Sequence, residues 1–356
     1  MAPGLTDTLQ QQAHNFSKPL PRSIFPDGIK TSGQHPPLYE ELRPYEDFPS
    51  EITGATVWNA EDYKNNPERW THHFKEEEIA ELSKAADDFR AAEIPLTGYL
   101  ESIRKELLDG KGFILFKGFP VEKWGNHKSA IAYMGLGTYL GYFVSQNGKG
   151  HVLGHVKDLG EDATQIDKVR IYRTNARQFF HADDSDLVGL LCIARALEGG
   201  ESDIASVHQV YNVLQRERPD VLKTLTEPIW YFDRKGEVSK GEDPYIRASV
   251  FYLEPGGQGP QIEAADVLEA TCKRLSLHMI LEVGDIQFLS NQHVLHARTE
   301  YKDHAPPAPR RHLMRLWLAT PEGEGGWKLP FHDRGEKKRG GIQVDDVGPV
   351  AHLDAE

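Results

Sequence analysis

A histidine and a group of aspartates stand directly before a strongly apolar run in the segment QFFHADDSDLVGLLC, residues 178–192. Polar groups at the end of a buried strand are costly to keep there unless something binds them. Because side chains alternate along a strand, His181 and Asp183 should project from one face and Asp184 from the other. A histidine and a carboxylate placed in this way could hold a metal ion. An acidic, solvated strand end with an incidental histidine would give the same pattern.

Two more histidines follow a predicted strand in LEVGDIQFLSNQHVLHARTEY, residues 281–301. His293 and His296 lie three residues apart, so in an extended chain they face opposite ways and only one could join His181 and Asp183. Two histidines and one carboxylate leave coordination positions open, as in the non-haem Fe(II) oxygenases. Zinc would accept the same ligands, with water in the fourth position. The pattern predicts a metal centre and leaves the ion and the second histidine open.

Arginines occupy one face of a predicted strand in PRRHLMRLWLA, residues 309–319. Alternation places Arg311 and Arg315 on the same side as Leu313 and Trp317, with the two arginines about 13 Å apart at the rise of a strand. A buried arginine needs a partner, and its planar guanidinium suits a carboxylate. We therefore expect this strand to present cations to an acidic small molecule, unless that face is solvated.

The order and spacing of these motifs resemble the taurine dioxygenase-like group of Fe(II)/2-oxoglutarate-dependent oxygenases. The matching motifs are HxD at His181, GGES at residues 199–202, N-x4-H from Asn291 to His296, and RRxxxR at residues 310–315. The similarity covers roughly residues 110–320. It implies an α+β, mainly β fold, with a double-stranded β-helix (jelly-roll) core that holds the metal, flanking helices and an extended N-terminal arm.

The resemblance also implies which residues hold the metal and the cosubstrate. His181, Asp183 and His296 would bind Fe(II), because the N-x4-H spacing selects the second histidine of the pair. Arg311 would pair with the distal carboxylate of 2-oxoglutarate. Ser202, in GGES, stands where the family often has threonine and would donate a hydroxyl hydrogen bond to that carboxylate. With O2 as the oxidant, the reaction would oxidise a C–H bond and release succinate and CO2.

The same resemblance indicates the class of substrate. Arg315 matches an arginine that holds the sulfonate of the substrate in taurine dioxygenase itself, which favours a small carboxylate such as an amino acid. The loop that carries a substrate-contacting histidine in taurine dioxygenase has Val144, Ser145 and Gln146 here instead, so taurine is not the expected substrate. Val144, Gln146 and Asn147 are the candidate pocket residues in this stretch. In the competing interpretation, Arg315 joins Arg311 at the cosubstrate or braces the iron shell, and the substrate is neutral.

The predicted secondary structure that must position these residues differs between the parts of the chain. An extended arm is predicted for residues 1–70, an oxygenase domain for 71–330 and a C-terminal tail for 331–356. Helical spacing of apolar residues occurs at 74–93, 99–112, 127–141, 207–219 and 264–276. Short strands are predicted at 112–120, 169–174, 186–197, 246–255, 285–290 and 312–319. Closely spaced short strands are typical of a sandwich or barrel.

The amino-acid composition limits which binding partners and which cellular location we expect for the protein. The formal net charge is −13, which argues against a nucleic-acid partner, because such a partner needs a basic face. The two cysteines, Cys192 and Cys272, form no CxxC pair or disulfide framework, as expected in a reducing compartment. No signal peptide or membrane span is predicted. We expect a cytoplasmic protein with a small-molecule substrate, and the composition does not indicate its oligomeric state.

Two alternatives to an oxygenase remain on the same barrel. The first is a metal enzyme that does not use 2-oxoglutarate, such as a zinc or iron isomerase or hydrolase. Arg311 and Ser202 argue against it, because both would lack their partner. The second is a non-catalytic binding protein, against which the intact set of metal ligands argues.

Overall fold

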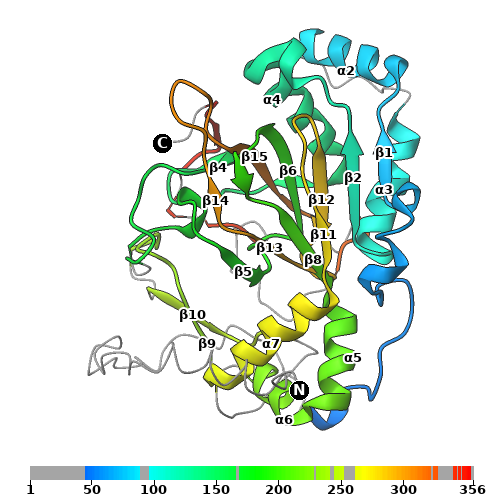
Figure 1. The fold of residues 1–356 in the computed structure, drawn as a ribbon, viewed down its shortest axis with the longest axis vertical. Helices are drawn as coiled ribbons and strands as arrows, with labels where there is room; N and C mark the ends of the chain where they lie inside the picture. Colours follow the sequence, from blue (N-terminus) through cyan, green and yellow to red (C-terminus); the bar gives the residue numbers. More distant parts are fainter. Residues whose placement is uncertain are drawn as a thin grey trace, which may run out of the picture. The chain divides into compact units, whose positions relative to one another are not determined.

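In a computed structural model of the chain, two β-sheets lie face to face (Figure 1). The larger sheet runs in the order β1 (Thr71–His73), β2 (Phe113–Lys117), β12 (Ile286–Ser290), β6 (Leu187–Ala194), β15 (His312–Ala319), β4 (His151–Lys157) and β16 (Val350–Ala351), with β3 (Tyr142–Phe143) also paired to β15. The smaller sheet runs in the order β11 (Leu277–Met279), β8 (Ser202–Ser206), β13 (Val294–Arg298) and β5 (Gln178–His181). This arrangement confirms the predicted double-stranded β-helix.

The structure describes residues 45–88, 96–165, 168–227, 230–240, 244–251, 261–321, 324–327, 340–342, 344–345 and 347–353. Its helices are α2 (Glu76–Asp88), α3 (Thr97–Asp109), α4 (Val121–Leu140), α5 (Val207–Glu217), α6 (Pro219–Leu225) and α7 (Gln261–Leu275). Short 3-10 helices are η1 (Tyr45–Asp47), η2 (Ala60–Asp62), η3 (Pro67–Arg69) and η4 (Ile171–Arg173). Two small antiparallel pairs also occur: β7 (Glu198–Gly199) with β14 (Tyr301–Lys302), and β9 (Trp230–Asp233) with β10 (Tyr245–Ala248).

The space between the two sheets is filled by an inter-sheet core. Alternate residues of the larger sheet, such as Val188 and Leu190 of β6, meet Ile204 of β8 and Met279 of β11 there. Three aromatic residues that precede β1, namely Trp58, Tyr63 and Trp70, are also buried in this core. The part of the predicted extended arm that carries these three residues is therefore anchored between the sheets, whereas Phe48 packs in the apolar cluster that includes Tyr211 and Leu214 of α5. Residues 1–44 of that arm lie outside the described residues.

Helices cover the other face of the larger sheet. Figure 1 shows α3 and α4 beside it, with α2 packed on α4, and residues such as Leu187 and Leu191 of β6 belong to the apolar core shared with these helices. Both faces of β6 are thus buried, which explains its nearly continuous apolar run. Gly189 keeps one position of this strand empty, because a Cβ there would lie 2.6 Å from the Tyr133 hydroxyl and from the Phe288 ring. The helix-covered face is densely packed.

A second helical layer covers the smaller sheet. Helices α5, α6 and α7 form an apolar cluster with Ala205 of β8 and Leu295 of β13. The α5 helix begins directly after β8, and the hydroxyl of its N-cap residue Ser206 accepts a hydrogen bond from the backbone N–H of Gln209. These helices include the segments 207–219 and 264–276, whose helical character the apolar spacing predicts.

Two predicted strands differ from the structure. The segment 169–174 is not a strand: its backbone closes on itself, with Arg173 N–H donating to Arg170 O and Thr174 N–H to Ile171 O, so η4 forms instead. These two N–H groups are therefore not available to a neighbouring strand. The strand predicted at 246–255 is β10, which ends at Ala248, and residues 252–255 lie outside the described part of the chain. Residues 89–93 of the first predicted helix lie outside it as well.

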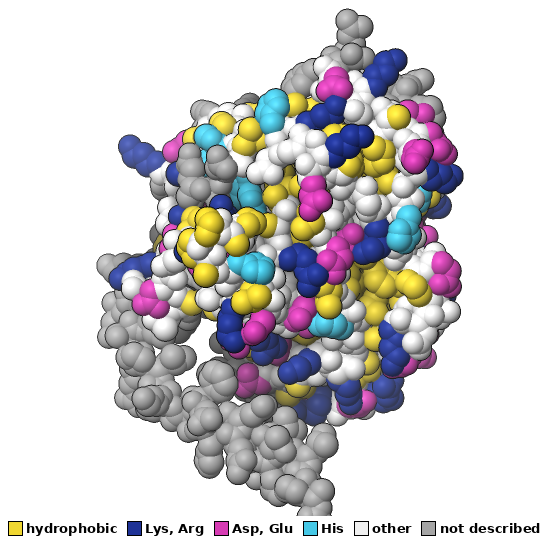
Figure 2. Space-filling model, turned by 45° about the horizontal axis from the view of Figure 1, so that its top comes forward, with side chains coloured by type: hydrophobic (Ala, Val, Ile, Leu, Met, Phe, Trp, Pro, Cys, Tyr) yellow, Lys and Arg dark blue, Asp and Glu magenta, His cyan; other side chains and the backbone are white. Residues whose placement is uncertain are grey.

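On the face drawn in Figure 2, basic and acidic side chains of the described residues are interspersed and form no extended basic field. None of the described helices has the length and apolar character that crossing a membrane requires. Cys192 and Cys272 are both free and buried.

Candidate metal centre

A pocket opens between the two sheets at the end where β5 and β13 pair. Its volume is about 410 Å³, including the part open to solvent. Its lining combines apolar side chains with ionisable side chains from β5, β13, β15 and the loops beside them: Val156, Gln178, His181, Asp183, Leu190, Glu201, Ser202, Leu281, His296, Ala297, Arg298, Arg311, Leu313 and Arg315. Most of these lining residues are polar or ionisable, so the pocket suits a small molecule that carries charged groups.

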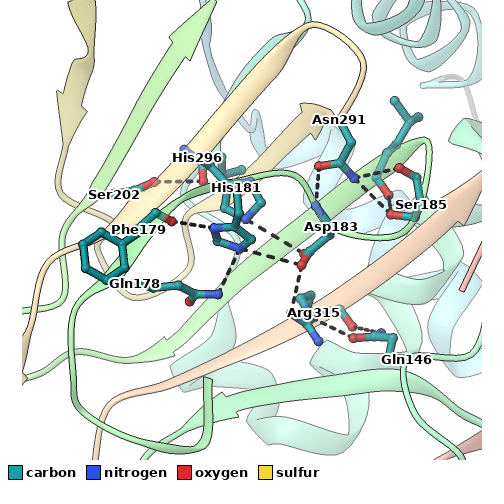
Figure 3. Close-up of polar contacts among 12 residues, drawn as sticks. Gln146, Gln178, Phe179, His181, Asp183, Ser185, Ser202, Asn291, His296 and Arg315 are labelled. Carbon is teal, nitrogen blue, oxygen red and sulfur yellow. Dashed lines mark hydrogen bonds and ion pairs between the residues drawn. The ribbon is translucent and has the colours of Figure 1, made fainter. Parts of the chain in front are cut away.

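Three of these residues, His181, Asp183 and His296, come together as a group that could hold a metal ion. One ligand atom from each lies within 4.8 Å of the others. The Nε2 atom of His181 is 3.8 Å from Asp183 Oδ1, and Nε2 of His296 is 3.9 Å from Asp183 Oδ2. His181 and His296 are directly paired in register across β5 and β13, so the strand pairing itself brings the two rings together (Figure 3).

Hydrogen bonds fix which nitrogen of His181 is free to bind a metal. Its Nδ1 lies 2.8 Å from the carbonyl oxygen of Phe179. Because a carbonyl only accepts hydrogen bonds, Nδ1 carries the proton and Nε2 presents its lone pair. The side-chain amide of Gln178 donates to this Nε2 at 2.9 Å. The Gln178 amide therefore lies at the nitrogen of His181 that would bind a metal ion.

His296 is held in its neutral form. Burial lowers the pKa of its imidazole to about 3, and the neighbouring His181 contributes in the same direction. Neutral imidazole is the form that binds a metal. Its Nδ1 is buried and has no hydrogen-bond partner among the described residues.

Asp183 is fixed from two sides. The side-chain oxygen of Asn291 accepts a hydrogen bond from the backbone N–H of Asp183 at 3.1 Å, and its amide donates to the backbone and hydroxyl oxygens of Ser185. Burial raises the pKa of the Asp183 carboxyl, but its charged surroundings, above all the guanidinium of Arg315, outweigh burial and hold the pKa below its usual range. The carboxyl is thus ionised, and its buried Oδ2 has no hydrogen-bond partner among the described residues.

Arg315 is locked in one orientation beside Asp183. Its Nη1 lies 3.4 Å from Asp183 Oδ1, and its Nε donates to Gln146 Oε1 at 2.8 Å. The guanidinium is stacked between Tyr172 and Trp317, 4.8 and 4.7 Å from the ring centroids. Tyr172 reaches this position because η4, rather than a strand, carries it. The arginine therefore braces the carboxylate of the metal group while it lines the pocket.

Arg311 marks the other end of the pocket. Its Nη2 donates to the carbonyl oxygen of Gly200 at 2.9 Å, while Nη1 is buried without a partner among the described residues. Gly200 has a φ of +75°, and a Cβ there would lie 2.5 Å from Arg311 Nε, so only glycine leaves room for this arginine. Ser202 is buried nearby, and its hydroxyl donates to Gln287 Oε1 at 3.2 Å.

Arg298 is a buried pocket residue that the motifs did not single out. It follows His296 by two residues on β13, so it projects to the same inward face. Burial, and then the charge of Arg311, lower the pKa of its guanidinium to about 10. The only signal in the sequence is this spacing, because HxR on a strand places the arginine beside the metal-binding histidine.

Other predicted residues lie away from the pocket lining. His293 turns from the pocket, and its Nε2 bonds to the carbonyl of Leu108 at 2.7 Å. Val144 packs in the inter-sheet core, and the Asn147 side chain accepts hydrogen bonds from the backbone of its own loop. Gln146 is buried against Arg315. Direct contact of Val144, Gln146 or Asn147 with a substrate stays a prediction.

The donor set fits a divalent transition metal together with a dicarboxylate. Two neutral imidazoles and one carboxylate leave coordination positions open, which suits Fe(II). At the opposite end, the partnerless Nη1 of Arg311 is a buried cationic donor of the kind that a carboxylate satisfies. An unpaired buried cation is costly, so the pocket is built for a ligand that carries negative charge there.

Sequence comparison identifies relatives with known names. Residues 78–317 match the family model "Taurine catabolism dioxygenase TauD, TfdA family". FR-33289 synthase of Streptomyces rubellomurinus is 29% identical over 311 residues, which cover 76% of this chain and 91% of that protein. Taurine hydroxylase-like protein SAT17 of Stachybotrys chartarum is 29% identical over 258 residues, 65% of this chain and 66% of that protein.

Solved structures show the same fold. Asparagine oxygenase in complex with Fe(II), 3-hydroxyasparagine and succinate is 16% identical, with a TM-score of 0.54 over 70% of this chain and 94% of that chain. The non-haem iron oxygenase OrfP in complex with Fe and α-ketoglutaric acid is 15% identical, with a TM-score of 0.52 over 70% of this chain and 93% of that chain.

Proposed function

The chain belongs to the taurine catabolism dioxygenase TauD, TfdA family, and from this premise we propose how its own residues carry out the reaction. It is an Fe(II)- and 2-oxoglutarate-dependent oxygenase that uses O2. We assign Fe(II) to His181, Asp183 and His296, and the distal carboxylate of 2-oxoglutarate to Arg311 and Ser202.

One observation carries this assignment. A metal-binding group within 4.8 Å and a partnerless buried guanidinium nitrogen lie in the same pocket, on strands that pair within one barrel. A zinc hydrolase would need the metal-binding group but would have no use for the partnerless guanidinium nitrogen of Arg311. A dicarboxylate that chelates the metal at one end and pairs with Arg311 at the other accounts for both.

The bound iron, with 2-oxoglutarate and O2, supplies the oxidising power for a C–H bond and yields succinate and CO2. The chain positions the reactants. Asn291 and Arg315 hold the Asp183 carboxylate in place, and the Phe179 carbonyl orients the His181 ring. None of these residues has to gain or lose a proton, because the imidazoles are needed neutral and the carboxyl is needed ionised throughout.

For the substrate, we propose a small carboxylate of the amino-acid class. Arg315 supports this, since its fixed guanidinium lines the pocket and suits a planar carboxylate. The fold is shared with an asparagine oxygenase and with OrfP, which has been solved with hydroxylated arginine. The ion pair of Arg315 with Asp183 supports the competing role, in which this arginine only braces the metal group and the substrate is neutral. We further propose a cytoplasmic location, which the two free cysteines favour.

An anaerobic absorption spectrum tests the assignment of metal and cosubstrate. Fe(II) and 2-oxoglutarate are added together, and we expect the weak visible charge-transfer band of a metal-bound 2-oxo acid. Iron binding without such a band would indicate a metal enzyme that does not use 2-oxoglutarate. Absence of iron binding would indicate a non-catalytic protein.

A substrate panel tests the proposed substrate class. Amino acids and small carboxylates are compared with neutral compounds by the succinate that each one releases, in the wild type and in Arg315→Leu. We expect carboxylates to stimulate the wild type and the variant to lose this stimulation. Stimulation by neutral compounds alone, equal in both proteins, would rule out the carboxylate class.

A further inference from the structure

We propose that Arg298 is a second anchor for the distal carboxylate of 2-oxoglutarate, acting with Arg311. The inference rests on the proposed function, because it names a further residue at the cosubstrate end of the same pocket. The first observation is position. Arg298 of β13 is directly paired in register with Ser202 of β8, and directly paired residues have neighbouring side chains on one face of the sheet. Arg298, Ser202 and Arg311 all line the pocket.

The second observation is that the two arginines share one aromatic ring. The guanidinium carbon of Arg298 lies 4.9 Å from the centroid of the Tyr301 ring, and that of Arg311 lies 5.1 Å from the same centroid. Two cations are therefore gathered at one end of the pocket. The ring partly offsets their charge but does not replace a negatively charged partner.

The third observation is how the hydrogen bonds of the two arginines are divided. Arg298 Nη2 donates to the carbonyl oxygens of Thr174 and Ala176, which fixes the side chain from behind. Its Nε and Nη1, like Nη1 of Arg311, are buried and have no partner among the described residues. Among the described residues, neither guanidinium forms an ion pair with a carboxylate. Asp303 Oδ1 accepts a hydrogen bond from the backbone N–H of Arg311 at 2.7 Å and not from its side chain.

These observations call for an anion with several acceptor oxygens between the two side chains. Burying two like charges side by side is costly unless a counter-charge joins them. The distal carboxylate of 2-oxoglutarate has two oxygens, so Arg311 and Arg298 could each take one. A single arginine would leave donors of the other buried and unpaired. Arg298 is thus assigned to recognition of the cosubstrate, in addition to holding the loop at Thr174.

The test compares two 2-oxo acids in anaerobic Fe(II) protein. 2-Oxopentanoate chelates iron as 2-oxoglutarate does but has no distal carboxylate. Each is titrated into the wild type and Arg298→Met, and the dissociation constant is read from the visible band. We expect the variant to bind 2-oxoglutarate about 10- to 100-fold more weakly, the loss typical of hydrogen bonds to a charged group. Its affinity for 2-oxopentanoate should be unchanged.

Two further variants separate recognition from folding. Arg310→Met is the matched control, because Arg310 is a neighbouring arginine on the exposed side that contacts Asp158, and it should bind both acids as the wild type does. If Arg298→Met does not melt cooperatively, Arg298→Lys is measured instead. It keeps the charge and should still bind 2-oxoglutarate more weakly and 2-oxopentanoate normally.

The outcomes distinguish this inference from the proposed function. Equal losses for both acids would assign Arg298 a structural role only, and an unchanged affinity for 2-oxoglutarate would exclude contact with it; either result overturns the inference. If the wild type itself shows no band with 2-oxoglutarate, the proposed function fails before Arg298 is considered.

Discussion

The two faces of strand β15 show how one strand serves both stability and chemistry. On the helix-covered face, Met314, Leu316 and Leu318 are fully buried among apolar side chains. On the face toward the pocket, Arg311 and Arg315 are almost as deeply buried, yet Arg311 keeps a donor without a partner among the described residues. Close-packed apolar contacts stabilise the fold whether or not a ligand is present. The unpaired donor is satisfied only when a ligand binds, so substitutions on the two faces should have separable effects.

The largest effect is expected for Asp183→Ala on the pocket side. The change removes the only carboxylate of the metal group and leaves Arg315 without its ion-pair partner. We expect Fe(II) binding to weaken strongly and 2-oxoglutarate-dependent O2 uptake to be lost, because both histidines alone hold the ion poorly. Anaerobic iron binding and oxygen-electrode assays measure this. Full iron occupancy with normal turnover would show that Asp183 is not a ligand.

A large loss of cosubstrate binding is expected for Arg311→Leu. Removing one partner of a buried charge pair costs about 3–5 kcal/mol, so the affinity for 2-oxoglutarate should fall by orders of magnitude while iron binding persists. Titration of the anaerobic Fe(II) protein measures both. An unchanged affinity for 2-oxoglutarate would show that Arg311 does not bind the cosubstrate. The two faces of β15 would then not differ in the way described above.

The opposite pattern is expected for Leu316→Ala on the helix-covered face. Deleting this fully buried side chain should lower the free energy of unfolding by about 2–5 kcal/mol, through lost burial and the cavity left behind. The affinities of the folded protein for iron and 2-oxoglutarate should stay at wild-type values. Denaturant unfolding and the same titration measure the two quantities. A shift in affinity larger than the shift in stability would show that the faces are coupled.

The smallest effect is expected for Ser202→Ala. The lost hydrogen bond to a charged carboxylate should cost about 1–3 kcal/mol of 2-oxoglutarate binding, less than the loss in Arg311→Leu. Isothermal titration or the visible band measures it, with Ser129→Ala, a buried serine of α4 outside the pocket lining, as control. A loss as large as that of Arg311→Leu would mean that Ser202 supports the fold of the site as well.

The sequence predicted the barrel where residue patterns are unambiguous. The apolar run of β6 and the alternation of β15 are visible by eye, and both are strands. The pattern failed at 169–174, because alternating apolar and basic residues do not reveal that Thr174 and Arg173 close local backbone bonds. The strand β4 has no comparable signal, since two histidines and a glycine interrupt its apolar residues.

The sequence predicted which residues form the site better than it predicted the contacts that those residues make. The motif spacing selected His181, Asp183 and His296, and strand pairing brings them together. The stacking of Arg315 between Tyr172 and Trp317 depends on segments far apart in the chain, and no local pattern encodes it. Arg298 was not predicted for a related reason. Its proposed role depends on its Nε and Nη1 groups, which stay unpaired among the described residues after Nη2 has bonded to two backbone carbonyls, and the sequence does not show this.

The most direct test of the metal centre compares His296→Ala with His293→Ala. The two histidines are three residues apart and both buried, but only His296 faces Asp183, while His293 bonds to Leu108. Each purified variant is loaded anaerobically with Fe(II), and bound iron is counted after gel filtration. We predict that His293→Ala retains iron as the wild type does and that His296→Ala does not. Loss of iron from His293→Ala with full retention by His296→Ala would contradict the proposed metal centre.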